Sequence, residues 1–352
     1  MSKLTYAQAG VDIDAYERAK DEFAKIIKET NAKSQFADCV VAGLGSFGAV
    51  FHTAKAAKKL GIENFADVES IDSVGTKVKI AHMMGRYDTV GHDMVGHSCG
   101  DILAQGAIPL VFGDYIAVEK LEPRIVVEII SGVARACENA GLILHYGEVA
   151  EMPKVYQEGH FDLVGNIRGV VDLDNVITGV NIKPGDTLVG VSSSGLHTNG
   201  FSMVNRVFFG DKKYSLTGQV PFSGKSLGEE LLTPHRNYTK PLTELFSKKV
   251  IKGIAHITGG GLPGNVVRIL PEHVQAKIKL GSWETLPIFL HIQKEGGIED
   301  NEMRRTFNMG VGLVLVCELE KSKEIRQVFE KYGMRTFEIG SVEEGERGVI
   351  FE

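Results

Sequence analysis

The sequence predicts an α/β fold (α+β type, with mixed sheets) in two domains. The chain has 352 residues, which is more than one hydrophobic core usually organises. Apolar strand-like runs alternate with segments of helical periodicity along most of its length. A polar stretch at residues 172–181 interrupts that alternation. We therefore expect an N-terminal domain of residues 1–172 and a C-terminal domain of residues 173–352.

Composition narrows the class of partner. The net charge is −6, and 43% apolar with 24% charged residues is typical of a soluble globular protein. The sequence contains no basic run of the kind that would predict contact with nucleic acid. No apolar run reaches the roughly 18 residues of a membrane span or forms a signal-peptide core. The four cysteines lie far apart without a CxxC pair, which argues against zinc and disulfides. We expect a cytoplasmic protein with a small-molecule substrate.

The elements of the first half follow in order. Asp14 and Glu17 form a capping-box pattern that predicts an amphipathic helix through residue 30. Helical spacing indicates two more helices, at residues 90–103 and at 123–139, the latter ending at Gly141. Strands are expected at residues 68–71, 110–118, 142–146 and 161–171.

A loose GxGxxG pattern, in which Gly45 and Gly48 are the second and third glycines, follows residues 40–41. The preceding strand is short and Phe47 lies inside the loop, so the context does not match a dinucleotide-binding site. We interpret the segment as a turn into a strand at residues 49–52.

Acidic residues accompany the predicted elements of this half. Asp72 ends a strand and begins the run DSVGTK, in which Lys77 is the cation. This run could supply a metal ligand, a phosphate-binding turn and a positive charge. The alternative is an ordinary turn that begins at Asp72. Asp93, His97 and Asp101 share one helix face at i, i+4 and i+8. Carboxylates suit Mg²⁺, whereas His97 suits a transition metal or, as we expect, a hydrogen bond. A solvated helix face is the alternative for the trio.

Two further features concern carboxylates in and after strands. Asp114 lies inside the predicted strand 110–118, where a buried carboxylate needs partners or a metal. Glu148 and Glu151 are expected in a loop directly after the strand 142–146, where ligands collect in α/β folds.

The second half contains two glycine-bearing loops. Residues 193–200, SSGLHTNG, lie between an expected strand at 187–191 and a helix starting at Phe201. This chemistry indicates a pocket for an anion-bearing small molecule, with a solvated turn as the alternative. The triple glycine 259–261 precedes an expected helix at 266–270, and its entropic cost favours a backbone that wraps an anion. A core strand is expected at 309–318.

In their order along the chain these motifs resemble those of the phosphoribosylformylglycinamidine cyclo-ligase (aminoimidazole ribonucleotide synthetase) family, nearly end to end. The motifs are YxxAGVDI at 6–13, GxFGA at 45–49, DxVGTK at 72–77, GxDxV at 91–95, QGAxP at 105–109 with Asp114-Tyr115, GExAEMP at 147–153, SSGLHxNG at 193–200 and HxTGGG at 256–261.

The resemblance implies an N-terminal domain that forms a homodimer by pairing its sheet, and ATP with Mg²⁺ between the domains; a K⁺ requirement stays open. It implies phosphorylation of the formyl amide oxygen, attack by an amidine nitrogen and loss of phosphate. The implied catalytic residues are Asp72, Asp93 and His197, with Asp72 and Asp93 as metal ligands. The implied nucleotide contacts are Asp72, Lys77, Asp93, Gly45 and Gly48. The implied substrate contacts are Glu148, Ser193, Ser194, His197, Asn199, Gly259, Gly260 and Gly261.

The chain departs from the family pattern near these groups. Gly100 stands where the family carries Asn, and His97 replaces an apolar residue. Ser73 replaces a glycine, and residues 146–150, YGEVA, replace GGETA, which alters Tyr146 and Val149. Two alternatives therefore stay open: a related ATP-dependent enzyme with another acceptor, and a nucleotide-binding paralogue without turnover. The sequence also leaves open which of Glu148, Glu151 and Asp101 contacts a ligand.

Overall fold

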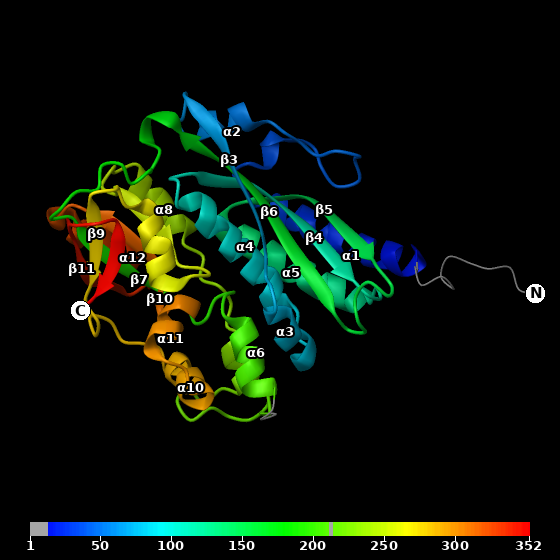
Figure 1. Ribbon diagram of the computed structural model, residues 1–352. Coiled ribbons are helices and arrows are strands. Elements are labelled where there is room, and N and C mark those ends of the chain that lie inside the picture. Colours follow the sequence, from blue (N-terminus) through cyan, green and yellow to red (C-terminus); the bar gives the residue numbers. More distant parts are fainter. Residues whose placement is uncertain (1–12, 211–213) are drawn as a thin grey trace, which may run out of the picture.

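In the computed structural model, which describes residues 13–210 and 214–352, the N-terminal domain is built on a four-stranded sheet (Figure 1). The strand order is β3-β6-β4-β5, with β4 and β5 parallel and the other pairs antiparallel. The strands are β3 (Phe65–Ser73), β4 (Ile108–Val118), β5 (Ile143–Glu151) and β6 (Phe161–Asp172). Most of the family motif at 6–13 lies outside the described residues.

Helices cover one face of this sheet. Helix α4 (Asp88–Leu103) packs on β3, β4 and β6, α5 (Pro123–Ala140) packs beside α4, and α1 (Ile13–Asn31) packs against α5 and β5. The three helices predicted from periodicity are therefore confirmed, and Gly141 ends α5 in the left-handed conformation at φ +80°. The patterns missed two shorter helices, α2 (Thr53–Lys59) and α3 (Lys77–Met84).

One boundary prediction was wrong. Strand β5 continues to Glu151, so Glu148 and Glu151 lie within a strand and not in a loop after it. The strand extends because its second half pairs with residues 114–118 of the neighbouring β4. Such pairing is a tertiary effect that local periodicity does not report.

A small lobe packs on the sheet face opposite α4 and α5, next to the start of β4 and β5 and the end of β6. Strands β1 (Val40–Ala42) and β2 (Val50–Phe51) form a hairpin, flanked by a 3₁₀ turn (Ala37–Cys39) and by α2. Its residues pack in one cluster with Val170 of β6. The glycine-rich segment is the loop of this hairpin and leads into a strand, as predicted, and not into a dinucleotide-binding helix.

The C-terminal domain is built on a six-stranded sheet in the order β12-β9-β11-β7-β10-β8, antiparallel except for β12 with β9. The strands are β7 (Thr187–Ser192), β8 (Gly253–His256), β9 (Val274–Ile278), β10 (Val311–Cys317), β11 (Thr336–Glu344) and β12 (Gly348–Phe351). The helices are α6 (Phe201–Phe209), α7 (Leu227–Leu231), α8 (Thr239–Phe246), α9 (Gly261–Val266), α10 (Pro287–Gly296), α11 (Asp300–Thr306) and α12 (Leu319–Lys331). Two 3₁₀ turns are Leu173–Asn175 and Val267–Ile269.

The second helix prediction of this half needs a correction. Helix α9 begins at the third glycine, Gly261, and ends at Val266, where a 3₁₀ turn replaces the helix expected at 266–270.

One hydrophobic cluster continues from α4 and α5 into α6, α8 and β7, so the two domains share a core. Among the described residues no helix is both long and apolar enough to cross a membrane.

Candidate active site between the two domains

The two domains face each other across a cleft of about 570 Å³. Ser70 and Asp72 of β3 and Asp101 of α4 line its N-terminal side. His256 ends β8 on the opposite side, where Thr258, Asn265 and Arg268 also line the cleft. The cleft is thus acidic on one wall and presents an imidazole, an amide and a guanidinium on the other.

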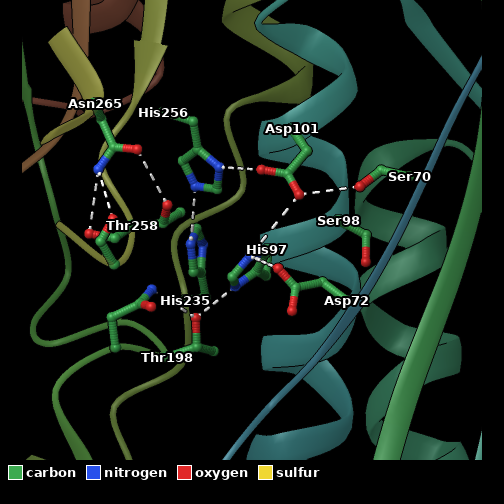
Figure 2. Close-up of polar contacts among 12 residues, drawn as sticks. Ser70, Asp72, His97, Ser98, Asp101, Thr198, His235, His256, Thr258 and Asn265 are labelled. Carbon is green, nitrogen blue, oxygen red and sulfur yellow. Dashed lines mark hydrogen bonds and ion pairs between the residues drawn. The ribbon is translucent and has the colours of Figure 1, made fainter. Parts of the chain in front are cut away.

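A cluster of three residues, Asp72, His97 and Asp101, lies at the edge of this cleft (Figure 2). The Nε2 atom of His97 is 2.7 Å from Oδ2 of Asp72 and 3.8 Å from Oδ2 of Asp101. The Asp72 side chain is 45% exposed and that of His97 only 6%. We call Asp72, His97 and Asp101 the rim cluster.

Each member of the rim cluster is held by a second partner. The Ser73 backbone N–H donates to Oδ1 of Asp72 at 2.7 Å. Ser70 Oγ donates to Oδ2 of Asp101 at 3.1 Å, and the Nδ1–H of His256 donates to its Oδ1 at 2.9 Å. The arrangement fixes the orientation of both carboxylates before any ligand enters.

The C-terminal domain contacts the rim cluster through the side chains of Thr198 and His256. Thr198 Oγ1 is 2.6 Å from Nδ1 of His97, and Nε2 of His256 is 3.2 Å from Nε2 of His235. His235 in turn donates from Nδ1 to the Arg236 carbonyl at 2.9 Å. Polar contacts therefore run continuously from the C-terminal domain into the rim cluster, as Figure 2 shows.

The residues of this network differ in the direction in which their pKa values are shifted. Burial lowers the pKa of His97, but its hydrogen bond to Asp72 and the charges of Asp101 and Asp72 outweigh burial and raise it. The hydrogen bond with His97 lowers the pKa of Asp72. Burial lowers the pKa of His235 well below its usual value, so this imidazole is neutral. The rim cluster thus carries ionised carboxylates at neutral pH.

A second acidic group, close in sequence, is completely buried. Lys77 and Asp93 form an ion pair at 2.8 Å in which both side chains have 0% exposure. The Lys77 ammonium also donates to the carbonyls of His197 and Thr233, each at 2.9 Å, and the His235 N–H donates to Asp93 at 2.6 Å. Burial lowers the pKa of Lys77 and raises that of Asp93, each opposed by the partner's charge.

This arrangement revises two predicted roles. We expected Lys77 and Asp93 to contact nucleotide phosphates, with Asp93 also holding a metal. In this structure each is the other's counter-ion, and neither side chain is open to a ligand. The pair instead ties α3 and α4 of the first domain to the backbone of the second domain at His197 and Thr233. We call Lys77, Asp93 and His197 the buried knot.

The role predicted for His197 also changes. Its side chain is 1% exposed, and Nε2 accepts the backbone N–H groups of Ser194 at 3.2 Å and Arg236 at 3.5 Å. Burial lowers its pKa well below the usual value. The backbone takes the left-handed conformation at φ +61°, which is uncommon outside glycine. The neutral, enclosed imidazole holds the loop in this structure, and its contact with substrate stays a prediction.

The other loop residues divide in the same way. Ser193 is buried and donates to the carbonyl of Gly195 and to Asn308, while Ser194 donates to the Pro234 carbonyl. Their hydroxyls are therefore occupied within the protein. Asn199 is only partly buried and donates weakly to Thr198 at 3.4 Å, so its amide stays a candidate for substrate contact.

The predicted glycine sites have different surroundings. Gly45 and Gly48 are exposed on the hairpin loop and do not line the cleft, so their nucleotide contact stays a prediction. Gly259 and Gly260 are exposed directly after Thr258 at the cleft. Gly261 is required sterically, because a Cβ there would lie 1.9 Å from the Arg304 carbonyl.

Glu148 lies away from the cleft. It lines a small cavity beside Asp114 and Tyr146, on the sheet of the first domain. Its substrate contact therefore stays a prediction, and Glu151 accepts the Leu121 N–H at 2.8 Å. Of the three acids left open by the sequence, only Asp101 lines the interdomain cleft.

His256, Thr198 and Arg268 were not among the predicted site residues, although Thr198 lies in the stretch 193–200 that predicts an anion pocket. His256 and Thr198 lie inside two of the recognised motifs, so their position in the chain was a usable signal. Arg268 lay in no motif, and only the fold brings its side chain to the cleft.

The fold and the site define a two-domain protein of the AIR synthase related class. Residues 55–171 match the model of the N-terminal domain of AIR synthase related proteins, and residues 183–351 match that of the C-terminal domain. Thiamine-monophosphate kinase from Stenotrophomonas maltophilia K279a shares the fold at a TM-score of 0.69 with 14% identity, covering 92% of this chain and 95% of that one. The hydrogenase maturation protein HypE, solved in complex with ATP, follows at 0.62 with 15% identity over 82% of each chain.

Curated relatives narrow the class to one family. Phosphoribosylformylglycinamidine cyclo-ligase of Alkaliphilus metalliredigens is 44% identical over 99% of this chain and 98% of its own. The enzymes of that name from Brevibacillus brevis and Carboxydothermus hydrogenoformans are 43% and 44% identical, covering 98% and 99% of this chain and 97% and 99% of their own. The chain belongs to the phosphoribosylformylglycinamidine cyclo-ligase family and is a ligase of purine biosynthesis.

Proposed function

We propose that the protein closes the imidazole ring of 5-aminoimidazole ribonucleotide from formylglycinamidine ribonucleotide, using ATP bound at the interdomain cleft. The observation that carries this is the convergence of Asp72 and Asp101 from one domain with His256, Thr258 and Arg268 from the other on one cleft. Phosphates and a ribotide require such a mixture of carboxylate-held cation, guanidinium and hydroxyl groups.

In this reaction the protein mainly has to position the substrate and ATP, and it forms no covalent intermediate with them. The formyl amide oxygen attacks the γ-phosphorus and ADP leaves; an amidine nitrogen then attacks the activated carbon and phosphate leaves. Phosphoryl transfer of this kind depends on alignment and charge neutralisation. Asp72 and Asp101 fit a divalent cation, because both carboxylates face the cleft and each is held by a second partner. That cation, Mg²⁺ in the first instance, would neutralise phosphate charge.

On the opposite wall the exposed Arg268 is the candidate for anion contact. Its Nη1 lies 3.4 Å from Oδ1 of Asn265, whose amide in turn donates to carbonyls of the glycine loop. This holds Arg268 and the exposed Gly259 and Gly260 on the same side of the cleft. We propose that they bind a phosphate group of substrate or nucleotide.

The assay supplies the protein with ATP, Mg²⁺ and formylglycinamidine ribonucleotide and measures ADP and aminoimidazole together. Substrate-dependent formation of both products supports the proposal. ADP release only with a different acceptor would point to a relative with another substrate, and tight ATP binding without turnover to a non-catalytic paralogue. Adding K⁺ to the same assay tests the monovalent-ion requirement.

We also propose a homodimer formed through the N-terminal sheet. The face of that sheet opposite α4 and α5, and the hairpin beside it, expose large apolar side chains, with Phe47 fully exposed and Ile71 and Val41 at 68% and 67%. Patches of this kind on a single chain mark protein contacts. Ile71→Asp should shift the mass in light scattering from dimer to monomer, and an unchanged mass would contradict this surface.

A cytoplasmic location is part of the proposal, consistent with four free, buried cysteines.

A further inference from the structure

The rim cluster contains an imidazole where a site for Mg²⁺ alone would have only oxygen atoms. Nε2 of His97 and one carboxylate oxygen each of Asp72 and Asp101 lie within 4.8 Å of one another. Ligands bound side by side on an ion at about 2.1 Å are about 3 Å apart. The separations of 2.7 Å and 3.8 Å from Nε2 to the two carboxylates bracket that value.

We propose that Asp72, His97 and Asp101 form a binding site for a first-row divalent transition ion, with His97 Nε2 as a ligand. The inference deepens the proposed function, because it names the ion that this chain's cleft prefers. One nitrogen with two carboxylate oxygens suits Mn²⁺, Fe²⁺, Co²⁺ or Zn²⁺, whereas Mg²⁺ takes oxygen ligands and parts reluctantly with its waters.

The surroundings of His97 match those of metal-bound histidines. Such a histidine donates its second ring N–H to an oxygen atom, which fixes the ring and its tautomer. Thr198 Oγ1 lies 2.6 Å from Nδ1 of His97 and comes from the other domain. A hydroxyl both donates and accepts, so Thr198 can accept from Nδ1–H when Nε2 binds an ion, and donate to Nδ1 when Nε2 donates to Asp72.

The second carboxylate of the cluster, Asp101, is held by a ring that lies against Gly100. A Cβ at this position would lie 2.4 Å from Cε1 of the His256 ring. The ring therefore occupies the space directly above Gly100, and from there its Nδ1 holds Oδ1 of Asp101. In this chain the ring therefore lies against Gly100 while it orients one ligand, Asp101, and His97 supplies another.

The test measures metal binding alone, without nucleotide or turnover, so that its failure and a failure of the proposed reaction are distinguishable. Mn²⁺ is titrated into the metal-free wild-type protein, and Mg²⁺ competes in a second series. We expect Mn²⁺ to bind at least about tenfold more tightly than Mg²⁺. Pulsed electron paramagnetic resonance of bound Mn²⁺ should show coupling to one imidazole nitrogen.

Variants locate the ligand. His97→Leu should weaken Mn²⁺ binding at least about tenfold, remove the nitrogen coupling and leave Mg²⁺ binding within about threefold. Thr198→Val should weaken Mn²⁺ binding about tenfold or more while the coupling persists. The matched control is His82→Leu, whose imidazole contacts Tyr87 and lines a different cavity. Bound Mn²⁺ without nitrogen coupling in the wild type, or equal affinity for Mn²⁺ and Mg²⁺, overturns the proposal whether or not the variants fold.

Discussion

The buried knot and the rim cluster both combine aspartate with histidine and share helix α4, yet only the knot contains a lysine and only the rim cluster reaches the cleft. Asp93, in the knot, has no exposure and is paired with an ammonium. Asp101, two turns later on the same helix, has a side chain 29% exposed and lines the cleft. His97 lies between them in position and in exposure. The depth of a carboxylate in the fold thus separates Asp93, which is enclosed with its counter-ion, from Asp101, which is open to the cleft.

The physical reason is the cost of removing charge from water. A fully buried carboxylate is tolerated only with a compensating charge and hydrogen bonds, and both are used up in holding it. Asp93 is enclosed with its counter-ion, and its side chain has no exposure to the cleft. Asp72 and Asp101 keep lone pairs directed to the cleft, so solvent or a cation can complete their coordination.

The largest expected effect comes from breaking the buried knot. Lys77→Met leaves the Asp93 carboxylate buried without its cation and should lower the free energy of unfolding by about 3–5 kcal/mol. Denaturant titration measures the loss, and the double variant Lys77→Met/Asp93→Leu should recover part of it. A loss below about 1 kcal/mol would show that the pair is not buried in solution. Asp93→Asn should cost stability too, while the Mg²⁺ dependence of nucleotide binding stays unchanged.

Asp114 extends this comparison, because it is a buried carboxylate for which the described part of the chain supplies no ion-pair partner. Burial raises its pKa to about 7. The folded-state pKa lies above that of the unfolded chain, so its stabilising contribution is complete below about pH 4 and is lost as pH rises toward 7. Between pH 4 and pH 8 the wild type should lose about 4 kcal/mol relative to Asp114→Asn. Denaturant titrations of both proteins at the two pH values measure this, and parallel pH dependences would contradict it.

Rim variants should show the opposite pattern to knot variants. Asp72→Asn and Asp101→Asn should lower kcat/KM about 100-fold or more, because cation charge at the phosphates is lost. Their unfolding free energies should stay within about 1 kcal/mol of the wild type. The matched control, Asp67→Asn, changes an exposed acid on the same strand β3 that does not line the cleft. Equal losses of activity in Asp67→Asn and Asp72→Asn would remove Asp72 from the site.

The smallest effect is expected at the contact between α4 and β8. Gly100→Ala places a methyl group against the His256 ring, so the ring must move and its hydrogen bond to Asp101 weakens. Overpacking of this kind costs about 1–3 kcal/mol. Thermal unfolding and steady-state kinetics measure the two consequences. Unchanged stability together with unchanged kinetics would show that the ring has room to relocate and does not orient Asp101.

Periodicity predicted α4 correctly, but it could not tell which end of the helix faces solvent. Asp93, His97 and Asp101 do share a face, at i, i+4 and i+8, and the sequence supplied that much. Nearly the whole helix is buried, because the second domain covers the side that the first leaves open. The gradient from 0% to 29% exposure along this face comes from contacts more than 100 residues away in the chain.

The sequence by itself determined the α/β class of the two halves, the three long helices and the main strands of the first half, and the order of motifs that identifies the family. Helix and strand periods are local, so the chain carries them without its neighbours. Only the tertiary structure decided that Lys77, Asp93 and His197 are enclosed while Asp101 and His256 meet at the cleft. Burial depends on which distant segments pack together, and burial sets whether a polar side chain is consumed by the protein or remains free for a ligand.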